Sequence, residues 1–270
     1  LPAGILAKKI SEKEHIPFVV HAHSTGVLDN SKYAKYRDII LKSAHGYYAV
    51  SKTVQEKLLE LGRKDTMIVP NFIDTKRFNI VKKSNKKLML INISNFFKAK
   101  AIEVLLKAVN ILVYEKKFTN VKLTIIGTGD YEEFYKSTAK ELKLDDYVEF
   151  TGYVPNDKIH TYLEKSDILC VSSRRETFNI PLVEAMSCGI PGISTKCGGP
   201  EEIITKETGL LVPLEDPKAF ANAILKMHKN YKNYNPIKIK EYVRNKYDKE
   251  VVCKDFIKKL ECVISEYNKK

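Results

Sequence analysis

Two carboxylates stand eight positions apart in the stretch RETFNIPLVEAMSCGIP, residues 175–191, across a junction between a loop and a helix. An apolar run typical of a buried strand, residues 168–171, ends just upstream, so Glu176 lies on the loop at the carboxyl end of this strand. Apolar spacing predicts a short helix over 180–186 that contains Glu184, and Gly189 is its left-handed stop. The amides and positive dipole end at the start of this helix attract anions such as a diphosphate. Carboxylates that accept hydrogen bonds from sugar hydroxyls on either side would complete a nucleotide-sugar site. The alternative is a structural turn whose two glutamates are merely solvated.

The pattern resembles the E-x7-E motif of the retaining glycosyltransferases of the group 1 (family 4) type. In that family the first Glu contacts the transferred sugar and the second holds the ribose hydroxyls, so the resemblance gives these roles to Glu176 and Glu184. Other family motifs follow in the family's order: VPNFID (69–74), IIGTGD (125–130), TGYVP (151–155), GGPE (198–201) and ETGLLVP (207–213). The resemblance implies an α/β protein of the GT-B fold, with two Rossmann-like domains built on parallel sheets. It also implies transfer of a hexose from a nucleoside diphosphate sugar to an acceptor hydroxyl with retention of configuration.

The resemblance further implies which residues bind the donor. The family has an Arg and a Lys after the first strand of the donor domain, where this chain has Asn95 and Lys100, so one positive partner of the diphosphate is missing unless Lys98 substitutes. Ala101 and Asn179 stand where the family usually has Gly, and both adopt left-handed backbone less freely. The expected donor-binding residues are Lys100, Asn95, Gly127, Tyr153, Val154, Phe178, Asn179, Ile180 and Glu184.

Histidines near the N-terminus supply the second catalytic candidate beside Glu176. The segment VVHAHSTG, residues 19–26, matches a strand end that in the family faces the reacting sugar and phosphate, and His23 occupies the matching position. His21 is expected to point the opposite way. A purely structural or exposed histidine is the competing interpretation. The region before residue 79 holds about half of the elements of a complete Rossmann-like domain, so the chain is expected to be N-terminally truncated, with an incomplete acceptor domain.

Short apolar runs alternate with helical patterns along the whole chain, which predicts parallel strands covered on both faces. The expected strands are 18–21, 47–50, 67–69, 88–93, 121–126, 148–151, 168–171, 190–194 and 210–212, and a long apolar stripe predicts a helix over 102–114. The polar, basic stretch 79–87 is the expected linker. The domains are therefore predicted as 1–85 (partial acceptor domain and linker), 86–227 (donor-binding domain) and 228–270 (C-terminal helices that cross back to the N-terminal domain).

Composition limits the other classes of function. The net charge of +13 divides into +7 over residues 1–85, −1 over 86–225 and +7 over 226–270, and only 6 of the 46 basic residues are Arg. Arg is the residue expected for base readout, so nucleic acid is not an expected partner, and a solvated Lys-rich surface explains the charge best. A peripheral contact with an anionic membrane face, or a charged acceptor, remains the alternative. No apolar run reaches the length of a membrane span.

The remaining patterns concern cofactors, compartment and acceptor. The five cysteines form no C-x-x-C pair and the histidines lack ligand spacing, which favours reduced thiols in a cytoplasm and no metal site or other cofactor. The substrate would be a UDP- or GDP-linked sugar, and the acceptor an unidentified glycan, lipid-linked or small molecule in polysaccharide or glycoconjugate biosynthesis. The string ISNF, residues 93–96, is similar to the branch that glycosylates malate in bacillithiol synthesis. A non-catalytic nucleotide-sugar binding fragment is the rival function.

Overall fold

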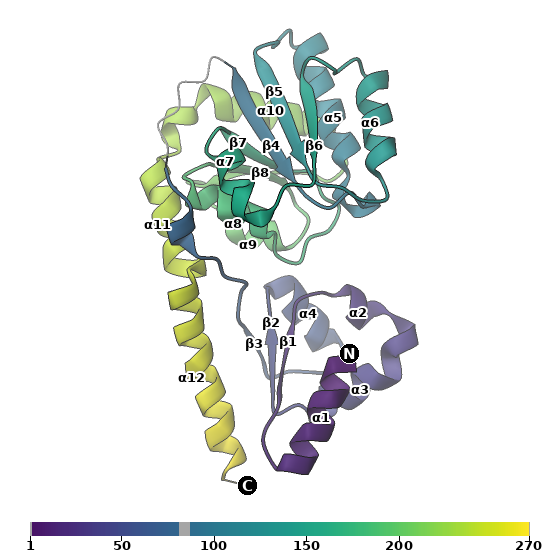
Figure 1. Cartoon of the computed structure of the whole chain (residues 1–270), viewed down its shortest axis with the longest axis vertical. Helices are drawn as coiled ribbons and strands as arrows, with labels where there is room; N and C mark the ends of the chain where they lie inside the picture. The colour runs from purple at the N-terminus through teal and green to yellow at the C-terminus, as the bar shows by residue number, and fades with distance from the viewer. Residues whose placement is uncertain (1, 81–86, 270) are drawn as a thin grey trace. The chain divides into compact units, whose positions relative to one another are not determined.

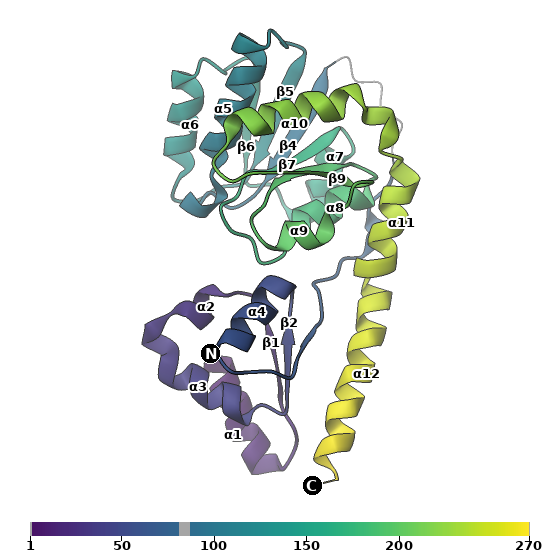
Figure 2. The same cartoon turned by 180° about the vertical axis from the view of Figure 1, so that it is seen from behind.

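The computed structural model describes residues 2–80 and 87–269, so most of the expected linker lies outside the described residues. The chain divides into two compact units, shown in Figures 1 and 2: unit 1 contains Leu1–Phe72 and Tyr247–Lys270, and unit 2 contains Ile73–Lys246. These limits differ from the predicted domain limits at 86 and 228, because residues on both sides of the predicted donor domain pack with unit 2. The predicted domain functions stay a prediction.

Unit 2 is built on six parallel strands in the order β6-β5-β4-β7-β8-β9. The strands are β4 (Leu88–Ile93), β5 (Val121–Ile126), β6 (Val148–Gly152), β7 (Ile168–Val171), β8 (Gly192–Thr195) and β9 (Gly209–Val212). Each expected strand of this region is confirmed to within two residues. The chain starts in the middle of the sheet and winds outwards in both directions, so the order reverses between β4 and β7. In open α/β sheets, ligands bind at the carboxyl ends of the strands at this reversal.

Helices cover both faces of the six-stranded sheet. The helices of this part of the chain are α5 (Ile102–Asn110), α6 (Glu132–Glu141), α7 (Ile159–Leu163), α8 (Ile180–Ser187), α9 (Gly199–Ile203), α10 (Pro217–Lys229) and α11 (Pro236–Tyr247). A π-helical turn, Ile111–Glu115, continues α5, so the helix predicted over 102–114 is confirmed. In Figures 1 and 2, α8 and α9 lie on one face of the sheet, and α10 lies on the other with α5, which it contacts.

Unit 1 is built on three parallel strands in the order β1-β2-β3. The strands are β1 (Val19–Ala22), β2 (Gly46–Ala49) and β3 (Thr66–Ile68), and the helices are α1 (Pro2–Glu14), α2 (Gly26–Asp29), α3 (Ala34–Ser43), α4 (Lys52–Glu60) and α12 (Lys249–Tyr267). The predicted strands are confirmed here as well. Tyr48, Val69 and Val252 form one buried cluster, so the C-terminal helix α12 completes the core of unit 1. Gly46 permits this packing, since a Cβ there would lie only 3.0 Å from a methyl group of Val263.

The C-terminal region therefore divides between the two units, whereas the sequence analysis expected all of 228–270 to return to the N-terminal domain. α11 stays with unit 2, where Ile239 and Val243 are fully buried. Gly189 explains how α11 fits: a Cβ there would lie 2.6 Å from the Cβ of Pro236, at the start of α11. Gly189 also has a positive φ of 73°, as its predicted role at the end of α8 requires.

No helix in the described part of the chain combines the length and apolar character needed to cross a membrane.

Candidate functional site

Two loops meet at the reversal point of the sheet of unit 2, one after β4 and one after β7. Lys100 comes from the first loop and Glu176 from the second, and Lys100 Nζ lies 2.8 Å from Glu176 Oε1. The same oxygen accepts a hydrogen bond from Ser173 Oγ at 2.7 Å and one from Asn179 Nδ2 at 3.2 Å. The Glu176 side chain is only 10% exposed. A cation, a hydroxyl and an amide thus fix this carboxylate at the position where the fold class binds ligands.

The backbone around Glu176 is held by the segment that leads into α9. Glu176 N–H donates to the Cys197 carbonyl at 2.7 Å, and Gly199 N–H donates to the Glu176 carbonyl at 2.9 Å. The two segments approach so closely that a Cβ on Gly199 would lie 2.5 Å from the Phe178 backbone. The Phe178 side chain is buried. The glycine-rich turn predicted over 198–201 therefore supports the loop that carries Glu176.

The start of α8 is capped by a side chain. Asn179 has a φ of 93°, and its Oδ1 accepts a hydrogen bond from Leu182 N–H at 3.0 Å. Pro181 has no N–H to offer. The first turn of α8 therefore presents fewer amides to an anion than the sequence analysis expected, which corrects that part of the prediction. Ile180, the first helical residue, is 41% exposed.

Glu184 lies in a different environment within the same helix. It is buried, and burial raises its pKa to about 7, although the positive charge of Arg77 and a hydrogen bond from Asn156 oppose this rise. Arg77 Nη2 donates in turn to the backbone carbonyl and the Oδ1 of Asn156, at 3.3 and 3.2 Å. Three segments distant in sequence thus converge on one carboxylate. Near neutral pH this group changes between a neutral acid and a carboxylate that accepts hydrogen bonds.

The loops after β5 and β6 contribute the other predicted donor-binding residues. Gly127 has a φ of 140°, and a Cβ there would overlap the Ser94 carbonyl oxygen, at 1.8 Å, so only glycine fits against the loop after β4. Asn95 is exposed on that β4 loop. Tyr153 is 74% exposed and Val154 is half-buried, both just after β6. These four residues follow neighbouring strands, and their predicted contacts with the donor stay predictions.

His23 belongs to unit 1 and is described there alone. Its Nδ1 lies 3.0 Å from Asn71 Oδ1. The expectation that His21 points the opposite way is wrong: the centroids of the two imidazole rings lie 4.1 Å apart, so both side chains lie on the same side at the end of β1. His21 Nε2 is 2.8 Å from the Val69 carbonyl oxygen. Burial lowers the pKa of His21, as does the neighbouring His23, against a raising effect of the bond to Val69.

Several residues of these clusters were not predicted from the sequence. Arg77 and Asn156 approach Glu184, and Ser173 binds Glu176. Each of them lies close to a feature that was recognised in the sequence: Arg77 follows VPNFID, Asn156 comes directly after TGYVP, and Ser173 follows the strand β7. Proximity to a motif was the available signal, but sequence alone does not show which neighbour turns its side chain towards the carboxylate.

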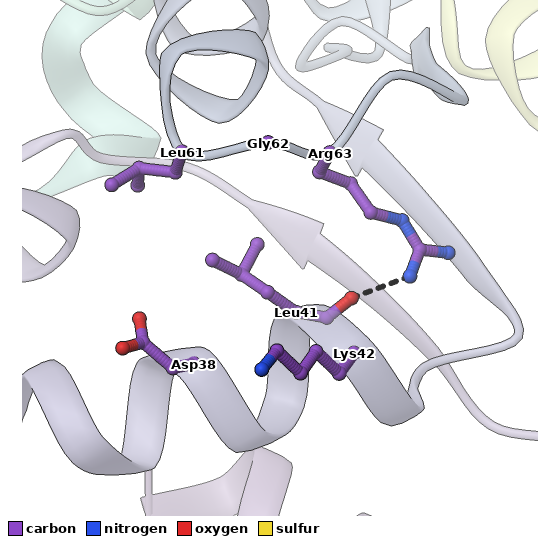
Figure 3. A pocket seen from close by; sticks show the side chains of 6 residues that line it. All are labelled: Asp38, Leu41, Lys42, Leu61, Gly62 and Arg63. Atoms are coloured by element: carbon purple, nitrogen blue, oxygen red, sulfur yellow. Dashed lines mark hydrogen bonds between the residues drawn. The ribbon is translucent and has the colours of Figure 1, made fainter.

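Unit 1 has a pocket that contains none of the predicted site residues. It has a volume of about 230 Å³ and is lined by Asp38, Leu41, Lys42, Leu61, Gly62 and Arg63 (Figure 3). Arg63 Nη1 donates to the Leu41 carbonyl at 2.5 Å, and Nη2 donates to the Ala44 carbonyl at 2.9 Å. A cation that satisfies the last carbonyls of α3 stabilises the helix end, so the arrangement around Arg63 is structural.

The described residues include no group of three or more His, Cys, Asp or Glu side chains arranged to hold a metal ion.

The sequence matches two families of glycosyltransferases. The family described as Glycosyl transferases group 1 matches residues 73–246, and the family described as Glycosyltransferase Family 4 matches residues 1–77. The first match alone covers more than half of the chain. This chain therefore belongs to the group 1 glycosyltransferase family.

Two curated relatives illustrate the degree of similarity. N-acetyl-alpha-D-glucosaminyl L-malate synthase of Bacillus anthracis is 30% identical over 232 residues, which cover 80% of this chain and 60% of the relative. The amylovoran biosynthesis glycosyltransferase AmsK of Erwinia amylovora is 27% identical over 199 residues, which cover 70% of this chain and 48% of the relative. The chain thus spans about half the length of the curated relatives it matches.

Solved structures confirm the predicted fold. Anabaena Alr3699/HepE, in complex with UDP and glucose, has a TM-score of 0.84 at 18% identity, covering 96% of this chain and 75% of that one. Sucrose-phosphate synthase from Thermosynechococcus elongatus has a TM-score of 0.83 at 22% identity, covering 97% of this chain and 72% of that one. The chain is an α/β protein of the GT-B fold with parallel sheets.

The first prediction concerns the left-handed cap at Asn179. Asn179→Ala loses the hydrogen bonds to Leu182 N–H and to Glu176 and places an alanine at a positive φ, so we expect the free energy of unfolding to fall by about 2 kcal/mol. Asn179→Gly loses the same two bonds but relieves the backbone, and we expect a change within about 0.5 kcal/mol. Urea unfolding of both variants measures the difference. Equal losses in the two variants would show that the backbone conformation is not the constraint.

The second prediction concerns the pH dependence of stability through Glu184. Its pKa is about 7 in the folded protein and 4.5 in the unfolded reference, so between these values the folded chain binds more protons and stability falls as pH rises. Glu184→Gln removes this titration. We expect the stability of the variant relative to wild type to rise between pH 5 and pH 8, by roughly 1 to 3 kcal/mol. Urea unfolding at both pH values tests this, with Glu133→Gln on an exposed position of α6 as the control. A difference that does not change with pH would contradict the assignment.

Proposed function

We propose that this chain carries the donor half of a retaining, metal-independent glycosyltransferase that moves a hexose from a nucleoside diphosphate sugar to an acceptor hydroxyl. The observation that supports the proposal most strongly is the meeting of Lys100 and Glu176 at the reversal point of the sheet of unit 2, at 2.8 Å. A cation for a diphosphate and a carboxylate for sugar hydroxyls are the two groups that such a donor requires, and they lie side by side.

In the proposed reaction the diphosphate leaves from the face of the sugar that the acceptor attacks. Lys100 neutralises the charge that develops on the leaving group, and the amides that remain at the start of α8 assist it. Glu176 orients the sugar through its hydroxyls, and Glu184 accepts hydrogen bonds from the ribose. His23 is the second catalytic candidate, because it occupies the matching position in the segment VVHAHSTG. Binding the diphosphate requires Lys100 to exchange its bond to Glu176 for bonds to phosphate, which frees the carboxylate for the sugar.

The nucleotide and the acceptor are parts of the proposal that the sequence leaves open. Alr3699/HepE was solved with UDP and glucose, which makes UDP the first nucleotide to test, followed by GDP. The similarity to the N-acetyl-alpha-D-glucosaminyl L-malate synthase of Bacillus anthracis, together with the ISNF string, makes L-malate one small-molecule acceptor to include. Glycans and lipid-linked acceptors are the others, and a lipid-linked acceptor would place the Lys-rich segments near an anionic membrane face.

A non-catalytic nucleotide-sugar binding protein is the second candidate function, because the chain covers 60% or less of the curated relatives named above. Incubation of the 270-residue chain with UDP- and GDP-linked hexoses and the acceptors above separates the two functions. We expect nucleotide binding in either case. Transfer, or slow hydrolysis of the donor, supports the enzyme, whereas binding without any turnover supports the binding protein.

The third prediction tests Glu184 as the ribose carboxylate. A carboxylate that accepts ribose hydroxyls contributes ~1.5 to 3 kcal/mol, so Glu184→Ala should weaken nucleoside diphosphate binding by roughly 10- to 150-fold. The ionised form accepts these bonds on both oxygens and more strongly than the neutral acid, so wild-type affinity should rise between pH 6 and pH 8, by up to roughly tenfold. The terminal phosphate of the nucleotide also titrates in this range, and Glu184→Gln controls for it. Calorimetric titration with UDP and GDP is the measurement. An unchanged dissociation constant would remove Glu184 from the site.

The fourth prediction tests Lys100 as the partner of the diphosphate. Lys100→Ala should weaken UDP binding by roughly 10-fold or more and leave uridine binding nearly unchanged, because uridine lacks the phosphates. Asn95→Arg, which restores a cation on the exposed loop after β4, should strengthen UDP binding. Titrations with diphosphate and nucleoside are compared for each variant. Equal effects on UDP and uridine would argue against a phosphate role for Lys100.

A further inference from the structure

The turn that carries Lys100 is held by the end of the neighbouring strand. Residues Lys98–Lys100 form a 3₁₀ turn, and each of their three carbonyls accepts a hydrogen bond from the residues that follow β7. The Lys98 carbonyl accepts from the Arg174 guanidinium, the Ala99 carbonyl accepts from Arg174 N–H at 2.7 Å, and the Lys100 carbonyl accepts from Ser172 Oγ at 3.0 Å. Three bonds on three consecutive carbonyls fix the orientation of this turn.

Arg174 is itself fixed by two carboxylates. Its Nη2 lies 2.6 Å from Glu103 Oε1, in the first turn of α5, and 3.2 Å from Glu215 Oε2, in the loop after β9. The Glu103 side chain is 14% exposed, and within the described part of the chain its Oε2 has no hydrogen-bond partner. Arg174 therefore stabilises the charge of a carboxylate that is largely removed from solvent. The guanidinium connects the carboxyl ends of three strands, β4, β7 and β9.

The turn needs such support because of the residue that ends it. Ala101 has a φ of 47°, and no side chain caps the helix that starts there. A residue with a Cβ disfavours this left-handed conformation, so the free turn would relax towards other conformations. Relaxation would move the Lys100 ammonium away from Glu176.

We infer that Arg174 is a positioning residue for Lys100: it holds the 98–100 turn so that the ammonium group lies where the diphosphate of the donor binds, without touching the donor itself. This inference rests on the proposed function for the role of Lys100. Among the described residues, Ser172 shares this task through its bond to the Lys100 carbonyl.

The first experiment needs no nucleotide. The ligand-free 270-residue chain is labelled with an amine-reactive acylating reagent, and the rate at Lys100 is compared by peptide mass spectrometry with the rate at Lys140, which is exposed on α6 outside this turn. Arg174→Met keeps the apolar stem but removes the hydrogen bonds, and should raise the relative rate at Lys100 roughly fivefold, because the ammonium leaves Glu176. Arg244→Met, at an exposed position of α11, should match wild type. Ser172→Ala should change the rate in the same direction by a smaller factor, and serves if Arg174→Met does not fold.

The second experiment compares UDP and uridine, or the guanosine pair if wild type binds GDP, by calorimetric titration. Arg174→Met should lose roughly tenfold in affinity for the diphosphate and none for the nucleoside, a split that general damage to unit 2 would not produce. If wild type binds the diphosphate, either of two results for Arg174→Met would overturn the inference: equal losses of affinity for both ligands, or a labelling rate at Lys100 that equals the wild-type rate. A wild type that binds neither nucleotide refutes the proposed function and with it the donor-directed role of Arg174, even if the rate at Lys100 responds.

Discussion

The ion pair between Lys100 and Glu176 connects the two loops on which the whole site depends. Strands β4 and β7 are neighbours in the sheet but are far apart in sequence, and the chain leaves them towards opposite sides of the sheet. Side chains at their carboxyl ends therefore meet only because the parallel register aligns the strands, with Leu90 beside Ile168. Two opposite charges at 2.8 Å stabilise each other, yet each also remains a partner for a ligand that offers the complementary charge or hydroxyl. A rigid site with exchangeable bonds results.

The two glutamates of the recognised motif differ in the way their charge is stabilised. Glu176 receives bonds from a cation, a hydroxyl and an amide on one oxygen, so its ionised form has partners before any ligand arrives. Glu184 is buried, and Arg77 and Asn156 offset only part of the cost of its charge, so its pKa lies at about 7. Ribose hydroxyls would supply the missing hydrogen bonds. Ligand binding and ionisation of Glu184 are then linked, and each favours the other.

The predictable part of this molecule is the part determined by local sequence. Short apolar runs predicted all nine strands of the described residues. An apolar stripe predicted α5, and the apolar spacing that ends at Gly189 predicted α8. Burial on both faces and helix termination depend on neighbouring residues, which is why these elements were predictable. The partners of the site are long-range. Arg77 reaches Asn156 across 79 positions, and Arg174 reaches Glu103 across 71, and neither pairing follows from spacing or composition. The orientation of His21 is a different case: its ring contacts that of His23, and the alternation of side chains along an extended chain places residues two positions apart on one face.

The departures from the family's glycines have a physical account in the structure. Ala101 and Asn179 both adopt positive φ values, at the ends of the two loops that meet at the site. Each side chain costs backbone free energy there, and such strain persists only where surrounding contacts fix the conformation. Asn179 supplies its own compensation, because its amide binds both Leu182 N–H and Glu176. Ala101 has no polar side chain, and the compensation comes from outside: Arg174 and Ser172 hold the turn before it. Ala101 and Arg174 thus belong to one local arrangement, in which bonds from the residues that follow β7 hold a backbone conformation that a residue with a Cβ disfavours.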